Sequence, residues 1–293
     1  MSDPRSEEAF GNELVHHVLR WGGERAPGRH TVVLLHGFMD AAGTWDLVAP
    51  ALAARGHRVL ALDLRGFGGG ARAPSGSYYH FADYVFDVAD VIDRLCPEEP
   101  VAVVGHSMGG TVATLYAGTF PERVARMVVV EGLGPPDMGP DLAPVRMRAW
   151  VDGVRRVRER GRGRGSFPRA EALRRLALNH PGVQAEVLAT RLVHLVEERP
   201  EEGPDHVTWR SDPLHRTTSP VPFFAKTFAA FARKITCPVL FVSGGPKGFH
   251  PDDEAERLAT FPDLRAVEVA DAGHMVHWTR PDALAAHLGD FLG

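Results

Sequence analysis

A serine between glycines, near the middle of the chain, has the type and spacing of a catalytic nucleophile. The stretch Gly105-His106-Ser107-Met108-Gly109 follows the apolar residues 101–104 and precedes a helix-like run. In the G-x-S-x-G pattern, the serine lies on a sharp turn between a strand and a helix, with its hydroxyl free to attack a substrate. Glycine is needed at both ends because strand and helix approach too closely for a β-carbon. The pattern predicts that Ser107 is a nucleophile, although a plain glycine-rich turn would give the same five residues.

Two backbone amides are candidates for binding the oxyanion that such an attack creates. Met108 begins the helix after the serine, and its N–H is available to a ligand because it has no acceptor within the helix. The second candidate is the N–H of Phe38, since His36-Gly37-Phe38 follows residues 31–35, an apolar run typical of a central strand. The alternative is that His36 and Gly37 only form a tight turn.

The elements around these residues alternate between strands and helices. Apolar runs predict an edge strand at residues 14–21 and buried strands at 31–35, 58–62, 101–104 and 124–130, with helices at 45–54, at 81–95 and after Ser107. Such alternation is typical of βαβ units and a parallel sheet, in which ligands bind at the carboxyl ends of the strands. His36, Gly37, Ser107 and Glu131 all fall at such ends. Asp63 and Arg65 also follow a strand, and we interpret them as organisers of the next loop.

The pattern stops between residues 134 and 235 and then resumes. Helices are predicted at residues 142–160, 169–178 and 183–197, so this segment is interpreted as a helical cap inserted into a core formed by residues 1–133 and 236–293. After it, strands are predicted at 239–242 and 264–269 and helices at 251–260 and 281–291. His274 follows the last strand, in the loop Asp271-Ala272-Gly273-His274.

Arginines cluster in the first third of this segment. They could bind an anionic substrate, but we favour the interpretation that they form a solvated helix face leading into a flexible loop, whose glycines could let the segment hinge. The arginines concerned are at positions 146, 148, 155, 156, 158, 160, 162 and 164.

Composition excludes several classes of function. A formal net charge of −4 argues against a general nucleic-acid binder. Cys96 and Cys237 are far apart in the sequence, which favours neither a redox pair nor a disulfide framework. The polar first residues lack the features of a secretory signal, and no apolar run approaches the roughly 18 residues of a membrane span. We therefore expect a soluble, cytoplasmic protein with no membrane partner.

Taken together, the motifs resemble those of the α/β-hydrolase fold superfamily, in its capped branch of epoxide-hydrolase-like and serine-hydrolase-like proteins. The resemblance extends over about residues 14–292. It implies a mostly parallel central sheet with helices on both faces, with Ser107 as nucleophile, His274 as general base, and the amides of Phe38 and Met108 as oxyanion donors. The matching residues are His36-Gly37-Phe38, Asp63-Leu64-Arg65-Gly66-Phe67-Gly68, Gly105-His106-Ser107-Met108-Gly109-Gly110 and Gly273-His274.

The acid that would orient His274 is where the sequence departs from most of these relatives. They place an aspartate shortly after the strand that corresponds to residues 239–242, whereas this chain has Lys247 there. A cation cannot stabilise the imidazolium. Some relatives take the acid from the end of the preceding strand, which is where Glu131 stands. Asp252 and Asp253 are the alternatives, although they fit the first turn of a helix equally well.

These residues predict a serine hydrolase that cleaves a small carboxylic ester, thioester or lactone through an acyl-enzyme. Neither a cofactor nor a metal ion is expected, since no H-E-x-x-H or clustered Cys/His spacing occurs. The aromatic run Phe223, Phe224, Phe228 and Phe231 could line an apolar pocket or simply pack in the core. Two alternatives stay open: a carbon–carbon bond hydrolase or cofactor-free perhydrolase with the same three residues, and a non-catalytic ligand receptor. Oligomeric state is not predicted.

Overall fold

A computed structural model describes residues 3–161 and 165–293. The strands are β1 (Arg5–Gly11), β2 (Leu14–Trp21), β3 (Thr31–Leu35), β4 (Arg58–Leu62), β5 (Val101–His106), β6 (Val124–Val130), β7 (Phe167–Pro168), β8 (Val196–Glu198), β9 (His206–Trp209), β10 (Val239–Ser243) and β11 (Leu264–Glu268). The α-helices are α1 (Ala49–Ala54), α2 (Phe81–Leu95), α3 (Met108–Thr119), α4 (Ala143–Glu159), α5 (Arg169–Asn179), α6 (Ala185–Leu195), α7 (Ala225–Ala232), α8 (Glu254–Leu258), α9 (Val276–Thr279) and α10 (Pro281–Leu292). The 3₁₀ helices are η1 (Ala42–Leu47), η2 (Pro121–Arg123), η3 (Pro140–Leu142) and η4 (Pro213–Arg216).

The centre of the molecule is a mostly parallel sheet. Within the described ranges it has eight strands in the order β1-β2-β4-β3-β5-β6-β10-β11. The strands from β4 to β11 pair in parallel, whereas β2 is antiparallel to both β1 and β4. The strand β5, which leads to Ser107, therefore lies in the middle, between β3 and β6. The α/β-hydrolase architecture predicted from the motifs is confirmed.

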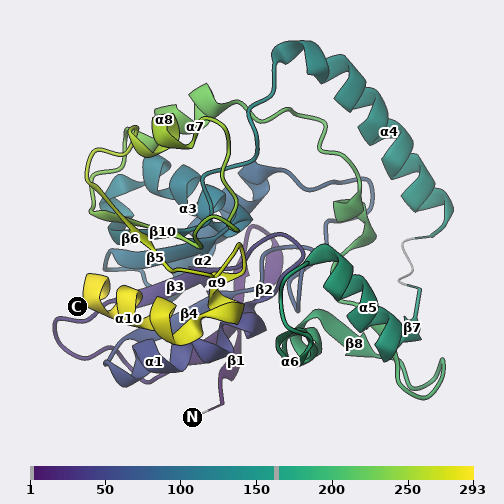
Figure 1. The fold of residues 1–293 in the computed structure, drawn as a ribbon, viewed down its shortest axis with the longest axis horizontal. Helices are drawn as coiled ribbons and strands as arrows, with labels where there is room; N and C mark the ends of the chain where they lie inside the picture. Colours follow the sequence, from purple (N-terminus) through teal and green to yellow (C-terminus); the bar gives the residue numbers. More distant parts are fainter. Residues whose placement is uncertain (1–2, 162–164) are drawn as a thin grey trace.

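Both faces of the sheet are buried by helices, as Figure 1 shows. Side chains alternate along each strand, so Val33 and Leu35 of β3 face one core cluster while Val32 and Leu34 face the other. The first cluster includes residues of α2, α3 and α7, and the second includes residues of η1, α1 and α10. Burial on both sides explains why the central strands are continuous apolar runs in the sequence.

The 134–235 segment lies mostly to one side of the sheet, with α4 running along its outer part (Figure 1). A third cluster joins α5, α6, β8 and β9, and Met275 and Trp278 connect it to the core. The helix α7 falls inside this segment, yet its Phe228 packs in the main core with helix α3. Division of the chain into core and cap at residues 134 and 235 stays a prediction.

Three local expectations are wrong. Residues 14–21 form β2, which is not an edge strand, because the polar residues before it form the outer strand β1 through a hairpin whose turn residues Asn12 and Glu13 have positive φ. The helix expected at 45–54 is divided into η1 and α1, with Pro50 in the first turn of α1. The 134–235 segment is not purely helical, since β7, β9 and β8 form a small antiparallel sheet.

Among the described residues, no helix combines the length and apolar character needed to cross a bilayer. Cys96 and Cys237 are both buried and unbonded to each other.

Candidate active site

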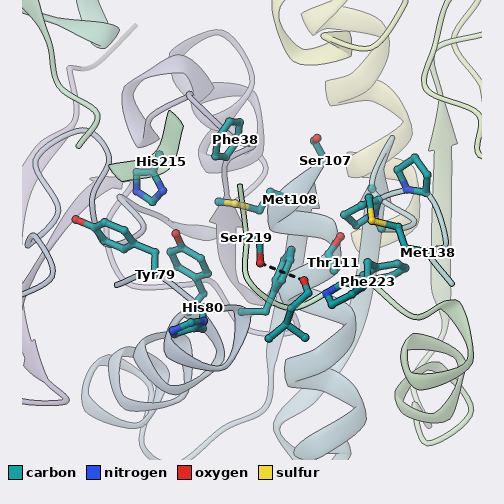
Figure 2. A pocket seen from close by; sticks show the side chains of 18 of the residues that line it. Phe38, Tyr79, His80, Ser107, Met108, Thr111, Met138, His215, Ser219 and Phe223 are labelled. Carbon is teal, nitrogen blue, oxygen red and sulfur yellow. Dashed lines mark hydrogen bonds between the residues drawn. The ribbon is translucent and has the colours of Figure 1, made fainter. Parts of the chain in front are cut away.

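Ser107 lies at the junction of β5 and α3, as the pattern predicts. The strand ends at His106 and the helix begins at Met108, so one residue makes the whole turn. Its backbone has φ 51° and ψ −116°, a conformation that costs energy for a residue with a side chain and is found at functional sites. Ser107 lines a pocket (Figure 2).

The glycines beside Ser107 allow the strand, the helix and their neighbours to approach closely. A β-carbon on Gly105 would lie 2.3 Å from the carbonyl oxygen of Gly109. One on Gly109 would lie 2.3 Å from the carbonyl oxygen of Leu35, at the end of β3. Both obstacles are backbone atoms, which cannot rotate away as a side chain can. The sequence pattern thus reflects packing around the turn.

Gly109→Ala should destabilise the protein and distort the turn. We expect the free energy of unfolding to fall by about 3 kcal/mol, because overpacking against fixed backbone is costly. Gly139→Ala is the matched control, since Gly139 has an ordinary φ of −62° and a β-carbon there would meet nothing within 4 Å. Denaturant unfolding of the two variants measures the difference. Equal stability would contradict the packing argument.

His274 is hydrogen-bonded to Ser107. The Nε2 atom of His274 lies 3.0 Å from Ser107 Oγ, within the range for proton transfer between a nucleophile and its base. The histidine loop is held against the end of β10, because the Gly273 N–H donates to the Gly244 carbonyl at 2.8 Å. Gly273 has a positive φ of 66°, which a glycine adopts without strain.

Glu131 lies on the other side of the imidazole. Its Oε2 is 3.3 Å from His274 Nδ1, slightly beyond the expected range of about 2.6–3.2 Å. The carboxylate also accepts hydrogen bonds from the amides of Gly244, at 2.5 Å, and Phe249. Glu131 follows β6 with φ 53°, and its side chain is fully buried. The two backbone amides and the imidazole therefore hold the carboxylate in a fixed position beside Nδ1, from which it can orient the ring.

The alternative acids have other partners. Asp253 precedes α8 and forms an ion pair with Arg257 at 2.8 Å. Arg257 in turn donates to the carbonyls of Leu133, Gly134 and Pro135, at the start of the 134–235 segment. Asp252 is exposed. This geometry favours Glu131 over Asp252 and Asp253.

Lys247, which occupies the position of the usual acid, is exposed. Among the described residues it forms no ion pair, and the contacts of His274 Nδ1 are with Glu131 instead. Lys247 therefore does not compete for the place of the acid.

The predicted oxyanion donors lie at the same pocket. Phe38 and Met108 both line it, and Figure 2 shows them near Ser107. Within the described ranges, neither backbone N–H donates to another group of the protein. Two free amides beside a nucleophile are what an oxyanion site needs.

A group of buried polar side chains lies behind His274, and the sequence analysis did not identify it. Asp40 accepts hydrogen bonds from Thr44 at 2.8 Å and from His277 at 3.0 Å. His106 Nε2 donates to the carbonyl oxygen of His274 at 2.9 Å. Burial lowers the pKa of His106 well below its usual value, so this ring stays neutral. These contacts fix the loop that carries His274.

The same group is relevant to the expectation that no metal binds. Potential ligand atoms of Asp40, His106 and His277 lie within 4.8 Å of one another. However, Asp40 and His277 already bond to each other, and His106 bonds to a backbone carbonyl. We therefore assign Asp40, His106 and His277 a structural role and no part in the reaction.

Asp63 has the loop-organising contacts expected from its place after β4. Its carboxylate accepts hydrogen bonds from the amides of Ala42, at 2.7 Å, and Gly69, at 2.9 Å, and from His17 Nδ1 at 2.7 Å. Arg65 forms two hydrogen bonds to Asp87 on α2. Both side chains hold the chain between β4 and α2.

The His17–Asp63 pair predicts how stability changes with pH. The hydrogen bond to Asp63 raises the pKa of His17 above its usual value of 6.5. A raised folded-state pKa gives stability that is present below the unfolded pKa and is lost as pH rises through the folded one. Hence His17→Gln should lower the melting temperature more at pH 5.5 than at pH 9.

Thermal unfolding at the two pH values measures this effect, with His287→Gln on α10 as the control. His287 lies on α10 and forms no ion pair among the described residues, so its substitution removes a histidine without removing a charged pair. An equal loss at both pH values in His17→Gln would contradict the assignment of the charged pair.

The pocket above Ser107 has a volume of about 670 Å³ and mostly apolar walls. Phe38, Met108, Met138 and Phe223 are among the apolar side chains that line it (Figure 2). Of the four aromatics expected from the sequence, only Phe223 is part of the described lining, whereas Phe228 is buried in the core. The helical spacing failed as a guide here because α7 begins after Phe224 and turns one face toward α3.

Polar groups also line this pocket. The ring of His215 stacks on that of Phe67, with ring centroids 3.9 Å apart. Burial lowers the pKa of His215 to about 3, so this side chain is neutral near pH 7. The arginine run contributes Arg146, whereas Arg148, Arg155, Arg156, Arg158 and Arg160 are exposed. Arg162 and Arg164 lie outside the described residues, as does most of the predicted hinge.

Comparison with known proteins agrees with the geometry. The model of the alpha/beta hydrolase fold family matches residues 30–281. The chain belongs to this family. A probable serine hydrolase of Drosophila melanogaster is 26% identical over 93% of this chain and 83% of its own length. Esterase Rv0045c of Mycobacterium tuberculosis is 29% identical over 91% of this chain and 83% of its own length.

Solved structures give the same fold. The hypothetical protein PA1622 from Pseudomonas aeruginosa has a TM-score of 0.81 and 25% identity, covering 99% of this chain and 98% of its own. Some other sequence matches span only 31% of the relative's own length. The Drosophila and Mycobacterium relatives, which this chain matches over most of their length, are named probable serine hydrolase and esterase.

Proposed function

We propose that the protein is a serine hydrolase that cleaves a small carboxylic ester, thioester or lactone through an acyl-enzyme on Ser107. The observation that carries this proposal is the 3.0 Å contact between Ser107 Oγ and His274 Nε2 at the base of a pocket. The buried carboxylate of Glu131 on His274 Nδ1 supports it further.

In the first half of the reaction, His274 removes the proton of Ser107 as its oxygen attacks the substrate carbonyl carbon. The oxyanion accepts hydrogen bonds from the amides of Phe38 and Met108. Glu131 holds the imidazole with its proton on Nδ1 and stabilises the imidazolium that forms. His274 then gives the transferred proton to the departing alcohol, thiol or, in a lactone, ring oxygen.

In the second half, water attacks the acyl-enzyme. His274 accepts a proton from this water, the same two amides stabilise the second oxyanion, and the imidazolium returns the proton to Ser107 Oγ as the acid product leaves. The residues of this chain therefore supply every proton transfer.

The walls of the pocket support a substrate with an apolar acyl group. Removing apolar surface from water contributes favourably to binding, by about 25 cal/mol per Å² before the costs of association. Part of the wall comes from the 134–235 segment, through Met138, Arg146, Thr217 and Phe223. This arrangement supports the proposal that the segment is a cap whose residues select the substrate.

A panel of substrates tests the proposal. The purified protein should react with a fluorophosphonate probe and should hydrolyse p-nitrophenyl butyrate, butyryl thioesters or γ-lactones, with one class preferred. Hydrolysis of a β-diketone without ester turnover would instead indicate a carbon–carbon bond hydrolase, and peracid formation would indicate a perhydrolase. Probe labelling with no turnover of any class would indicate a ligand receptor and contradict the proposal.

A further inference from the structure

Arg146 is the one Lys or Arg side chain among the described residues that line the pocket above Ser107. It lies in the first turns of α4 and is half-buried, in contrast to Arg148 two residues further on, which is exposed. The two arginines cannot face the same way, because successive residues of a helix point in different directions. Arg146 thus differs from the rest of the arginine run.

The guanidinium of Arg146 has no acidic partner among residues 3–161 and 165–293. Within the described part of the chain it forms no ion pair, and its buried Nε atom has no hydrogen-bond acceptor. Among the described residues of the lining, Glu131 has the only carboxylate, and its oxygens are already bonded to His274, Gly244 and Phe249. An arginine stays charged at any working pH, so a partly buried one without a counter-charge is unfavourable unless a ligand supplies it.

Two hydroxyl groups line the same pocket as Arg146. Tyr78 Oη lies 2.6 Å from Thr217 Oγ1, and both residues line the pocket. Burial raises the pKa of Tyr78, while the nearby positive charge of Arg146 opposes part of that rise. The ring of Tyr78 packs edge-on against Trp150, one helical turn after Arg146, with centroids 5.5 Å apart. Arg146, Tyr78 and Thr217 therefore form a polar corner in a mainly apolar pocket.

We propose that Arg146 forms an anion subsite for a carboxylate carried by the substrate at a distance from its scissile carbonyl. The inference rests on the proposed esterase function and narrows the substrate class to ω-carboxylated esters or thioesters, such as monoesters of dicarboxylic acids. A guanidinium binds a carboxylate through two parallel hydrogen bonds. These bonds are stronger in a pocket that excludes part of the water. Apolar walls between the two ends suit the methylene chain that links them.

Because Arg146 is the single Lys or Arg of the described lining, the ligand that it neutralises should carry one negative charge. A phosphate or diphosphate group carries about two or more negative charges and is usually bound by several donors and cations, whereas one guanidinium matches one carboxylate. His215 adds no charge, because it is neutral near pH 7. The corner therefore fits a monoanion.

Paired substrates measure the role of Arg146. The p-nitrophenyl monoesters of succinic, glutaric, adipic and suberic acid would each be compared with the corresponding methyl diester, which has the same chain without the charge. The wild type should prefer the carboxylated member of at least one pair. Arg146→Gln should lower kcat/KM for that member by about 10- to 100-fold, mainly through KM, because a hydrogen bond to a charged group is lost. The same substitution should lower kcat/KM for the methyl diester much less, so the ratio of the two values within the pair should fall.

Two other variants complete the comparison. Arg146→Lys keeps the charge without the planar fork and should restore part of the preference. Arg148→Gln removes an exposed arginine from the same helix and should leave every substrate unchanged. If Arg146→Gln slows both members of a pair equally, or if the wild type has no preference at any chain length, a subsite for a carboxylate on the acyl chain is wrong.

The carboxylate could belong to the acyl chain or to the leaving alcohol. Hydrolysis of 4-butyryloxybenzoate, whose carboxylate leaves with the alcohol, compared with its methyl ester separates the two sources. A preference that depends on Arg146 in this pair alone would assign the subsite to the leaving group.

Binding separates this proposal from the proposed catalysis. Titration of Ser107→Ala with adipate and with hexanoate by calorimetry needs no turnover. We expect adipate to bind at least 10-fold more tightly than hexanoate, and Arg146→Gln in the same background to abolish the difference. Should the wild type hydrolyse no ester while this difference persists, the subsite stands and the hydrolase proposal fails. Equal binding of the two acids would overturn the subsite whatever the turnover.

Discussion

Ser107→Ala should lower kcat by about 10⁴-fold or more and abolish labelling by a fluorophosphonate probe. The loss is large because the hydroxyl is the group to which the acyl chain becomes bonded, and no other side chain of the pocket is hydrogen-bonded to His274 Nε2 within the described residues. Turnover of the preferred ester, measured at saturating substrate, gives the effect directly.

The control for this substitution is Ser75→Ala, which removes an exposed hydroxyl from the loop before α2. It should retain full activity and full labelling. Both variants should melt near the wild-type temperature, since Ser107 Oγ makes no contact beyond His274 that the fold requires. Wild-type rates in Ser107→Ala would refute the nucleophile assignment.

Glu131→Gln should lower kcat by about 10³- to 10⁴-fold with little change in KM. An amide at this position no longer stabilises the imidazolium, and it can favour the tautomer of His274 whose Nε2 cannot accept the serine proton. Comparing Glu131→Gln, Ser107→Ala and the double variant tests whether the two residues act together. Because triad members act as a unit, Glu131→Gln in the Ser107→Ala background should cost almost nothing more.

A structural explanation must be separated from this catalytic one. Glu131 also accepts hydrogen bonds from the amides of Gly244 and Phe249. In Glu131→Gln, the NH₂ group of the glutamine would face one of these N–H groups, which should cost about 1–3 kcal/mol in stability. Melting temperatures therefore accompany the kinetics. Asp253→Asn is the matched control, because it should loosen the Arg257 contact with residues 133–135 and change KM or stability instead of kcat. Loss of kcat in Asp253→Asn, with Glu131→Gln active, would reassign the acid.

Much of the fold and site follows from local patterns. Ser107, the glycines around it and the buried strand β5 form one continuous stretch, so the sequence predicts their arrangement well. His274 and Glu131 each follow a strand in the α/β order, and the sheet brings both residues to the same end. Topology does this reliably because parallel strands deliver their following residues to one edge.

Other features depend on contacts that no local pattern contains. Asp40, His106 and His277 are far apart in sequence, and their association depends on how the loop after β3 meets α9. Two features of the sequence could have indicated side chains that hold the His274 loop in place. These are Asp40 in the loop after β3 and His277, three residues after His274. Arg146 looked like its neighbours in a basic run, and only the packing of α4 near Tyr78 distinguishes it.

The covalent intermediate is the central claim, and mass spectrometry of the trapped enzyme tests it most directly. The protein would be quenched in acid during turnover of its preferred p-nitrophenyl ester and digested with trypsin, which should release residues 95–123 as one peptide. We predict that this peptide gains the mass of the acyl group, that fragmentation places the group on Ser107, and that hydroxylamine removes it. An acyl group found on another residue, or steady turnover with residues 95–123 unmodified at every quench time and in the fluorophosphonate-treated sample, would contradict the account.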